Sequence, residues 1–189
     1  MNRAVFLDKD GTLIHDIPYN VDPAKIILEG TATEALQRLQ SAGFMLIVIS
    51  NQPGLAHGYF DKAALNAAEA RLRALLAGGG VILNAFYFCP HHPDGKVAEY
   101  ALECACRKPS PGMLFRAAAD HRIDLSRSWM IGDILNDVEA GSRAGCRTIL
   151  IDNGNETEWE PGEHRTPSAV VCDLRHAAEI VLNSEPVPA

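Results

Sequence analysis

The sequence predicts an α/β fold, a three-layer sandwich in which a mostly parallel sheet lies between two layers of helices. Short apolar runs of strand length alternate along the chain with segments whose apolar residues recur at helical spacing. The runs at 4–7 and 44–49 are apolar throughout, which is typical of strands buried on both faces of a parallel sheet. Polar residues follow these runs, as they do where parallel strands end at a shared, ligand-binding edge.

Six strands are expected, each a short apolar run bounded by turn-forming or charged residues. In chain order they are residues 4–7, 45–49, 85–88, 129–131, 147–151 and a short edge strand at 169–171. The spacing of apolar residues predicts helices over residues 32–42, 62–77, 111–121, 136–144 and 174–182. Thr31 and Glu34 have the capping-box spacing, and Asp61 is expected to cap the second helix.

The chain has 189 residues, of which 47% are hydrophobic, enough for one domain with a substantial core. A single domain is expected over 1–183, followed by a frayed tail at 184–189 that contains two prolines. Residues 156–167, with a Pro-Gly pair inside, are expected to form a surface loop.

The net charge of −7 argues against a nucleic-acid or anionic-membrane partner. No apolar run approaches the roughly 20 residues that span a bilayer. The first strand is expected from residue 4, directly after Met1-Asn2-Arg3, which leaves no room for a signal peptide before Asp8, so a cytoplasmic protein is expected. A monomer is expected as well.

The stretch Asp8-Lys9-Asp10-Gly11-Thr12 follows the first strand and carries two carboxylates one residue apart. Gly11 favours an immediate turn, which would let the two acids converge on one point. Two carboxylates in one pocket repel each other and therefore usually bind a cation or share a proton. The pentapeptide alone is equally compatible with two solvated acids in a turn.

Further polar residues follow later strands or open later helices, and in a parallel sheet they would share the edge that holds Asp8. They are Ser50, Asn51, Arg107, Lys108, Asp133 and Asp137. Together they would bring carboxylates, a hydroxyl, an amide and two cations to one place. Because this set contains no histidine base, it fits phosphoryl transfer assisted by a metal better than acyl transfer.

Two close pairs, Cys89 with His91 and Cys104 with Cys106, flank a polar loop and suit a tetrahedral structural zinc. Such a site would fill all four ligand positions and would restrain the loop that leads into Arg107 and Lys108. The alternatives are ordinary, partly buried cysteines, or His92 in place of His91. Cys146 and Cys172 are expected to be packed thiols.

The motifs Asp-x-Asp-Gly-Thr, a Ser after the second strand, Lys before Pro, and Gly-Asp-x-x-x-Asp resemble those of the haloacid dehalogenase-like phosphohydrolases. They occur in the family's order between about residues 4 and 151. The resemblance implies a Rossmann-like sheet, and the likeness to a narrower subgroup of this family implies a minimal cap. It also implies that Asp8 is the nucleophile and that Asp10 is the general acid and base.

By the same resemblance, Mg²⁺ is held by Asp8, the main-chain carbonyl of Asp10, and Asp133. Ser50 and Lys108 donate to the phosphate oxygens, and Arg107 contacts the transferred or the second phosphate. Asp137 is expected to orient Lys108 or a metal-bound water.

The Cys-x-His and Cys-x-Cys-Arg-Lys-Pro segments resemble a narrower subgroup, the heptose 1,7-bisphosphate and histidinol-phosphate phosphatases. The stretches over residues 16–19 and 50–54 look more like those of the heptose enzymes. The expected substrate contacts are Arg107 and Lys108 together with residues of these two stretches, namely Asp16, Tyr19, Ser50, Asn51, Gln52 and Pro53. His57 departs from the basic Arg or Lys that the subgroup often has before Gly58. A heptose bisphosphate of lipopolysaccharide precursor synthesis is thus the expected substrate.

Other functions remain open at this stage. Within the enzymes, the substrate could be histidinol phosphate, another small sugar phosphate or a polynucleotide 3′-phosphate, the last least favoured by the acidic charge. A phosphoryl transferase would need a cap to exclude water, and the chain is short for one. A catalytically silent, metal-stabilised binding module is disfavoured because binding alone needs no nucleophile.

Overall fold

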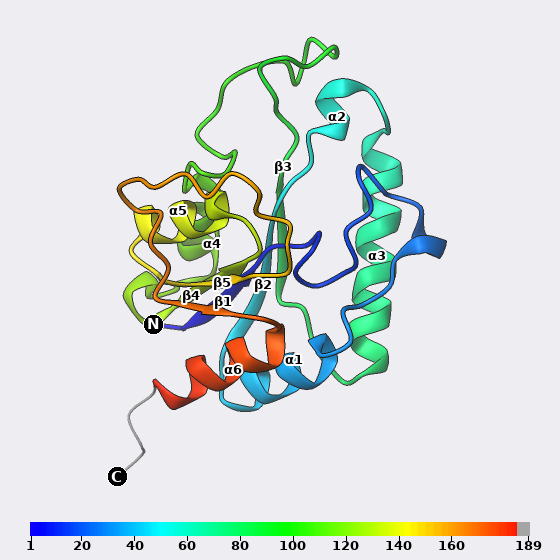
Figure 1. The fold of residues 1–189 in the computed structure, drawn as a ribbon. Coiled ribbons are helices and arrows are strands. Elements are labelled where there is room, and N and C mark those ends of the chain that lie inside the picture. The colour runs from blue at the N-terminus through cyan, green and yellow to red at the C-terminus, as the bar shows by residue number, and fades with distance from the viewer. Residues whose placement is uncertain (185–189) are drawn as a thin grey trace.

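The structure, a computed structural model, describes residues 1–184 (Figure 1). Six strands form a single sheet in which every neighbouring pair is parallel. They are β1 (Ala4–Leu7), β2 (Met45–Asn51), β3 (Ala85–Cys89), β4 (Trp129–Gly132), β5 (Arg147–Ile151) and β6 (Ala169–Val171). The predicted fold class is confirmed, and all six strands lie where the apolar runs placed them.

The strands are arranged in the order β3-β2-β1-β4-β5-β6. The chain therefore winds outward in one direction from β1 to β3, returns to the centre, and winds the other way from β4 to β6. The direction reverses between β1 and β4, which is where open parallel sheets have their ligand-binding crevice. Asp8 and Asp10 follow β1, and Asp133 and Asp137 follow β4, so the predicted acidic residues lie on both sides of this reversal point.

Helices cover both faces of the sheet (Figure 1). Those longer than four residues are α1 (Ala32–Ser41), α3 (Lys62–Gly78), α4 (Gly112–His121), α5 (Leu135–Ala144) and α6 (Leu174–Asn183). The apolar residues of α1, α3 and α6 belong to one core cluster, and those of α4 lie in a second cluster with residues of α5. None of the helices within 1–184 is both long and apolar enough to cross a membrane.

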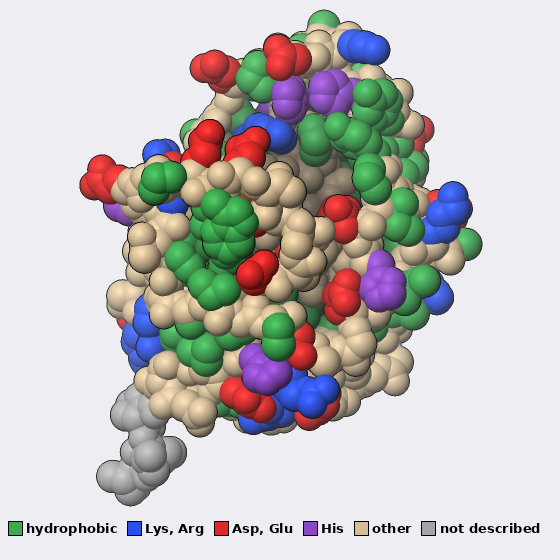
Figure 2. All heavy atoms as spheres, viewed as in Figure 1, with side chains coloured by type: hydrophobic (Ala, Val, Ile, Leu, Met, Phe, Trp, Pro, Cys, Tyr) green, Lys and Arg blue, Asp and Glu red, His purple; other side chains and the backbone are tan. Residues whose placement is uncertain are grey.

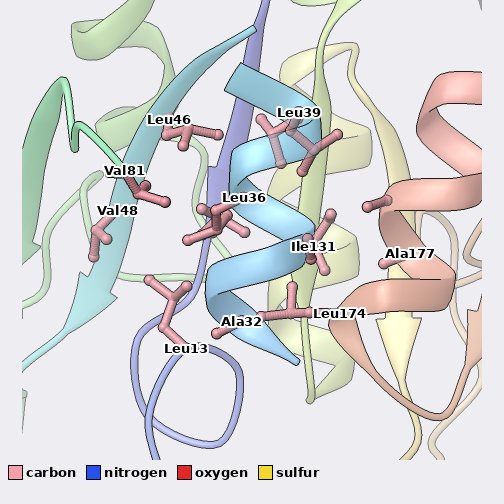
Figure 3. Packing of buried hydrophobic residues seen from close by; sticks show 14 of the residues in the cluster. Leu13, Ala32, Leu36, Leu39, Leu46, Val48, Val81, Ile131, Leu174 and Ala177 are labelled. Carbon is pink, nitrogen blue, oxygen red and sulfur yellow. The ribbon is translucent and has the colours of Figure 1, made fainter. Parts of the chain in front are cut away.

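Alternation along each strand assigns side chains to these two clusters. In β1, Val5 and Leu7 face the α1 side, whereas Ala4 and Phe6 face the α4 side. Figure 3 shows Leu36 of α1 surrounded by apolar side chains of the sheet and of the flanking segments. Burying a side chain of this size contributes about 1.5–3 kcal/mol, so the many such contacts fix the sheet on which the site is built.

Two local predictions need correction. Thr31 is the N-cap residue of α1, but its side chain makes no capping hydrogen bond, because its backbone is already close to helical (φ −101°, ψ −2°). Cys172 is exposed, since it lies after the edge strand β6 and directly before the first turn of α6. Cys146 is buried, as expected for a packed thiol.

The segments that border the site contain little regular structure. A short helix that the sequence did not predict, α2 (Gly54–His57), follows β2. The loop over 90–110 between β3 and α4 contacts this helix through hydrogen bonds from Lys96 N and Val97 N to Ala56 O. The predicted frayed tail at 184–189 falls outside the described residues except for Ser184, which hydrogen-bonds to Ile180 O.

Candidate active site

Asp8 lies directly after β1 at the centre of the sheet. Its main-chain N–H donates to Ile131 O of β4 at 3.0 Å, so the two strand ends that carry Asp8 and Asp133 are tied together. Gly11 turns the chain with φ +76°, a conformation that side chains rarely adopt. A Cβ atom at this position would also overlap the Asp133 carboxylate. The Asp-Gly turn therefore allows both acidic loops to approach the same point.

Lys108 is buried between carboxylates from two different elements. Its Nζ donates to Asp8 Oδ1 at 2.5 Å and to Ile49 O at 2.9 Å, and it forms an ion pair with Asp137 Oδ1 at 2.6 Å. Burial alone would lower the pKa of Lys108, but the charges of Asp137 and Asp8 raise it above its ordinary value. The two carboxylates thus favour the charged form of the lysine and hold it against the predicted nucleophile.

Asp133 and Asp137 carry strongly shifted pKa values. Burial, with the nearby charges of Asp8 and Asp137, raises the pKa of Asp133 to about 8. Burial also raises the pKa of Asp137 to about 6, although the charge of Lys108 opposes this shift. Oxygen atoms of Asp8, Asp133 and Asp137 all lie within 4.8 Å of one another. Mg²⁺ prefers oxygen ligands, which these three carboxylates supply. The pKa values of Asp133 and Asp137 are raised because the acids are buried close together, and a bound cation would offset their charge. The residues therefore fit Mg²⁺.

Asp10 has a different environment from Asp8. Burial is the main cause that raises its pKa, while Lys9 opposes the shift. Lys9 Nζ lies 3.1 Å from Asp10 Oδ1, and Gln52 Nε2 donates to Asp10 Oδ2 at 3.2 Å. A carboxyl group with a raised pKa can hold a proton at moderate pH, which a general acid must do.

Two adjoining hollows of about 270 Å³ each open above these residues, and Figure 2 shows the hollowed face with acidic, apolar and histidine side chains around it. The first is lined by Asp8, Asp10, Asp16, Asn51, Lys108, Asp133, Ile134 and Asn155. The second is lined by Asp10, Asp16, Pro18, Tyr19, Asn20, Asn51, Gln52, Pro53 and Gly54. Most residues expected to contact the substrate therefore border one continuous depression.

Ser50 and Arg107 are the two expected substrate contacts that line neither hollow. Ser50 is buried, and its Oγ accepts a hydrogen bond from Gln52 Nε2 at 2.8 Å. Arg107 Nη1 donates to His91 O at 3.4 Å, which links the arginine to the loop that carries the cysteines. Asn51 has a positioning contact in addition to its place in the hollow, because its side chain pairs with the main-chain N–H and C=O of Lys108.

An aromatic cluster lies beside the second hollow. The rings of Tyr19 and Tyr59 meet edge to face at 4.8 Å, and His57 stacks on Tyr59 at 5.4 Å. The His57 ring also lies 4.8 Å from that of His92. His57, which stands where the subgroup often has an Arg or Lys, thus belongs to an aromatic cluster that borders the second hollow through Tyr19.

The cysteine and histidine pairs come together into one cluster. The three Sγ atoms of Cys89, Cys104 and Cys106 lie 3.1–3.5 Å apart, and His91 Nδ1 is 3.4 Å from Cys106 Sγ. A tetrahedral zinc with ligands at about 2.3 Å places sulfur atoms about 3.8 Å apart, so a small expansion of this cluster accommodates the ion. His92 lies outside the cluster, where its Nδ1 accepts from Asp94 N.

Two residues that hold Asp133 had no predicted role: Thr12, which belongs to the Asp-x-Asp-Gly-Thr motif, and Asn155, which was not singled out. Thr12 Oγ1 donates to Asp133 Oδ1 at 3.1 Å, and Asn155 Nδ2 donates to Asp133 Oδ2 at 2.7 Å. Asn155 follows β5, so the rule that polar residues after parallel strands converge would have placed it at the same edge. The sequence offered no motif to distinguish it from an ordinary turn residue.

Comparison with known proteins agrees with this geometry. The HAD-hydrolase-like family model matches residues 105–177. The D-glycero-beta-D-manno-heptose-1,7-bisphosphate 7-phosphatase of Pasteurella multocida is 41% identical over 157 residues, which are 82% of this chain and 84% of that protein. The chain belongs to the haloacid dehalogenase-like hydrolases. The Escherichia coli heptose bisphosphate 7-phosphatase is 36% identical over 96% of this chain and 88% of its own length.

Solved structures of haloacid dehalogenase-like proteins have the same fold. The D,D-heptose 1,7-bisphosphate phosphatase of B. bronchiseptica, complexed with magnesium and phosphate, superposes with a TM-score of 0.79 at 32% identity. The match covers 97% of this chain and 99% of that one. A HAD-like phosphatase of Mesorhizobium loti has a TM-score of 0.82 at 35% identity, over 95% and 87% of the two chains. The predicted family is confirmed.

Proposed function

We propose that this haloacid dehalogenase-like protein is a magnesium-dependent phosphatase that removes the 7-phosphate of D-glycero-β-D-manno-heptose 1,7-bisphosphate through an aspartyl-phosphate intermediate. The observation that carries the proposal is the convergence of Asp8, Asp133 and Lys108 at the reversal point between β1 and β4, beside the open depression. The names of the relatives and the phosphate and magnesium in the B. bronchiseptica structure support the substrate and the metal.

In the first step, an oxygen of Asp8 attacks phosphorus while the bond between phosphorus and the sugar oxygen breaks. Asp10 gives its proton to the leaving oxygen, a role that its raised pKa favours. In the second step, the Asp10 carboxylate takes a proton from water, the water oxygen attacks phosphorus, and the bond to Asp8 breaks. Inorganic phosphate leaves and both acids return to their starting states.

Mg²⁺ would be held by Asp8, Asp133 and the main-chain carbonyl of Asp10, and when bound it supplies positive charge that offsets the phosphoryl oxygens. Lys108 adds a second positive charge beside the nucleophile, since its ammonium already contacts Asp8. Asp137 keeps that ammonium in place through the ion pair at 2.6 Å.

We propose that Cys89, His91, Cys104 and Cys106 hold a structural zinc. The loop between the pairs has no helix or strand among its described residues, so a metal clip is the feature that would fix it. Arg107 follows the last cysteine and contacts His91 O, and it is the proposed anchor for the second phosphate. Asp16 and Tyr19 are the proposed contacts to the sugar.

A substrate panel tests the assignment. We expect kcat/KM for heptose 1,7-bisphosphate to exceed those for histidinol phosphate and simple sugar monophosphates by at least about tenfold, because the second phosphate contributes binding energy at the reacting centre. A preference for histidinol phosphate would refute the substrate. Binding without turnover of any phosphate ester would favour the silent binding module.

Arg107→Ala tests the anchor within the same panel. It should lower kcat/KM for the bisphosphate more than for a monophosphate. Arg116→Ala removes an exposed arginine on α4 that pairs with Asp120, and it serves as the matched control with unchanged kinetics. Equal losses on both substrates in Arg107→Ala would limit this residue to the transferred phosphate.

A further inference from the structure

The segment over residues 153–165, here named the strap, follows β5 and contains neither helix nor strand. Its side chains are nevertheless tied to the two acidic loops. Asn153 Nδ2 donates to Gly11 O at 2.7 Å, and Asn155 Nδ2 donates to Asp133 Oδ2 at 2.7 Å. The sequence predicted only a polar surface loop over residues 156–167, with no contact to the acidic loops.

Two acidic contacts fix the strap on α5, the helix that follows Asp133. Glu156 Oε2 accepts from the main-chain N–H of Leu135 at 2.6 Å, at the first turn of the helix, where donors lack partners. Farther along, Arg165 Nη1 lies 3.0 Å from Glu139 Oε2, and the arginine is mostly buried. Both contacts lie after Asn155 in the strap, and the nearer one, at the adjacent Glu156, holds the Asn155 amide at the edge of the site.

The Asp133 carboxylate is held at both oxygens. Thr12 donates to Oδ1 and Asn155 to Oδ2, so the group cannot rotate without losing one of these bonds. It needs such restraint because the carboxylates of Asp8 and Asp137, within 4.8 Å, repel it from the position in which the three acids converge. Thr12 alone would leave Oδ2 free to turn away.

We propose that Asn155 is a positioning residue that orients Asp133 for Mg²⁺, and that the strap exists to deliver this amide. The inference rests on the proposed magnesium site. It predicts that removing the Asn155 amide lowers the affinity for Mg²⁺ in the absence of any substrate. Loss of a hydrogen bond to a metal-ligating group typically costs about 10–100-fold in metal affinity, and the same range is expected here.

Asn153→Ala is the matched control. Asn153 is the same residue type and lies two positions away in the strap. Its Nδ2 donates to Gly11 O at 2.7 Å and its Oδ1 accepts from Asn155 N at 3.1 Å, so Asn153→Ala loosens the docking of the strap but leaves the bond from the Asn155 amide to the Asp133 carboxylate. If the strap acted only by docking, both alanine variants would bind Mg²⁺ equally poorly. If Asn155 acts through Asp133, only its variant loses affinity.

The experiment is calorimetric titration of MgCl₂ into the purified full chain without substrate, for wild type, Asn155→Ala, Asn155→Leu and Asn153→Ala. Asn155→Leu keeps the side-chain size without a donor and replaces Asn155→Ala if that variant misfolds, as judged by thermal unfolding without metal. We expect a Kd about 10–100-fold higher for the two Asn155 variants and within about threefold of wild type for Asn153→Ala.

Each other outcome refutes a defined statement. Wild-type affinity in both Asn155 variants would overturn the positioning role. An equal loss in Asn153→Ala would replace it with a docking role of the whole strap, which also overturns the proposal. If the wild type binds no Mg²⁺, the magnesium site of the proposed function is refuted. This outcome differs from failure of the inference, in which the wild type binds Mg²⁺ and the Asn155 variants bind it equally well.

Discussion

Replacing Lys108 with Met should destabilise the protein severely at neutral pH. The ammonium of Lys108 is buried and satisfies two carboxylates, Asp8 at 2.5 Å and Asp137 at 2.6 Å. Methionine has nearly the same length but carries no charge, so the variant keeps the packing and leaves two buried acids without their cation. Removing one partner of a buried ion pair typically costs about 3–5 kcal/mol.

The size of this loss should depend on pH. The pKa of Asp137 is already raised to about 6 with Lys108 present, and without the lysine it must rise further. At pH 5.5 Asp137 would then be protonated in the variant, which avoids the cost of an unpaired buried charge. We expect a loss of about 3–5 kcal/mol at pH 7.5 and a clearly smaller loss at pH 5.5.

Urea unfolding followed by circular dichroism, without added metal, measures this difference. Thermal unfolding gives a second measure of the same loss. At about 2–4 °C per kcal/mol, a loss of about 3–5 kcal/mol in the free energy of unfolding should lower the melting temperature at pH 7.5 by about 6–20 °C. Asp137→Asn added to Lys108→Met removes the unpaired charge and should recover part of the loss, and the double-mutant cycle isolates the coupling. A loss under about 1 kcal/mol at pH 7.5, or no recovery in the double variant, would refute the reasoning.

Two further predictions concern the metals and pH. Protein purified without added metal should contain one tightly bound zinc per chain. Cys104→Ser should lose both the zinc and thermal stability, since one ligand is gone. Metal analysis that finds no zinc in the wild type, or zinc-free wild type that is as stable as the zinc-bound form, would contradict this prediction. Without Mg²⁺, stability should rise as pH falls from about 8 to 5, because Asp133 has a pKa of about 8 when folded and its ordinary value of 3.8 when unfolded, so the folded state binds more protons. Saturating Mg²⁺ should flatten that slope, and a flat profile in the metal-free protein would show that Asp133 is not perturbed.

The sheet was predictable because each strand is a short apolar run with a polar terminus. Asp8 and Asp133 could be placed together from sequence because both follow strands of the same parallel sheet. The convergence of the four zinc-type ligands was likewise visible as two close pairs. Each of these inferences relies on spacing along the chain combined with one rule of topology.

Contacts that depend on long loops could not be predicted. Asn155 meets Asp133 only because the strap returns from β5 across the site, and no periodicity in the strap indicates that path. The contact of Arg107 with a phosphate stays a prediction, whereas its hydrogen bond to His91 O is set by the folding of the 90–110 loop and could not be predicted from the sequence. Exposure of Cys172 depends on how β6 ends, which a three-residue edge strand leaves undetermined in the sequence.

The most direct test of the account is whether phosphate is transferred to Asp8. Enzyme quenched in acid during turnover of heptose 1,7-bisphosphate and Mg²⁺ would be reduced with borohydride, which converts an aspartyl phosphate to homoserine, and then digested with trypsin. Cleavage after Lys9 places Asp8 on the peptide 4–9 and Asp10 on the next one, so mass spectrometry separates the two acids. We predict homoserine at position 8 in the wild type and none in Asp8→Asn, which should also release no phosphate. Homoserine at position 10, or substantial turnover by purified Asp8→Asn, would contradict the account.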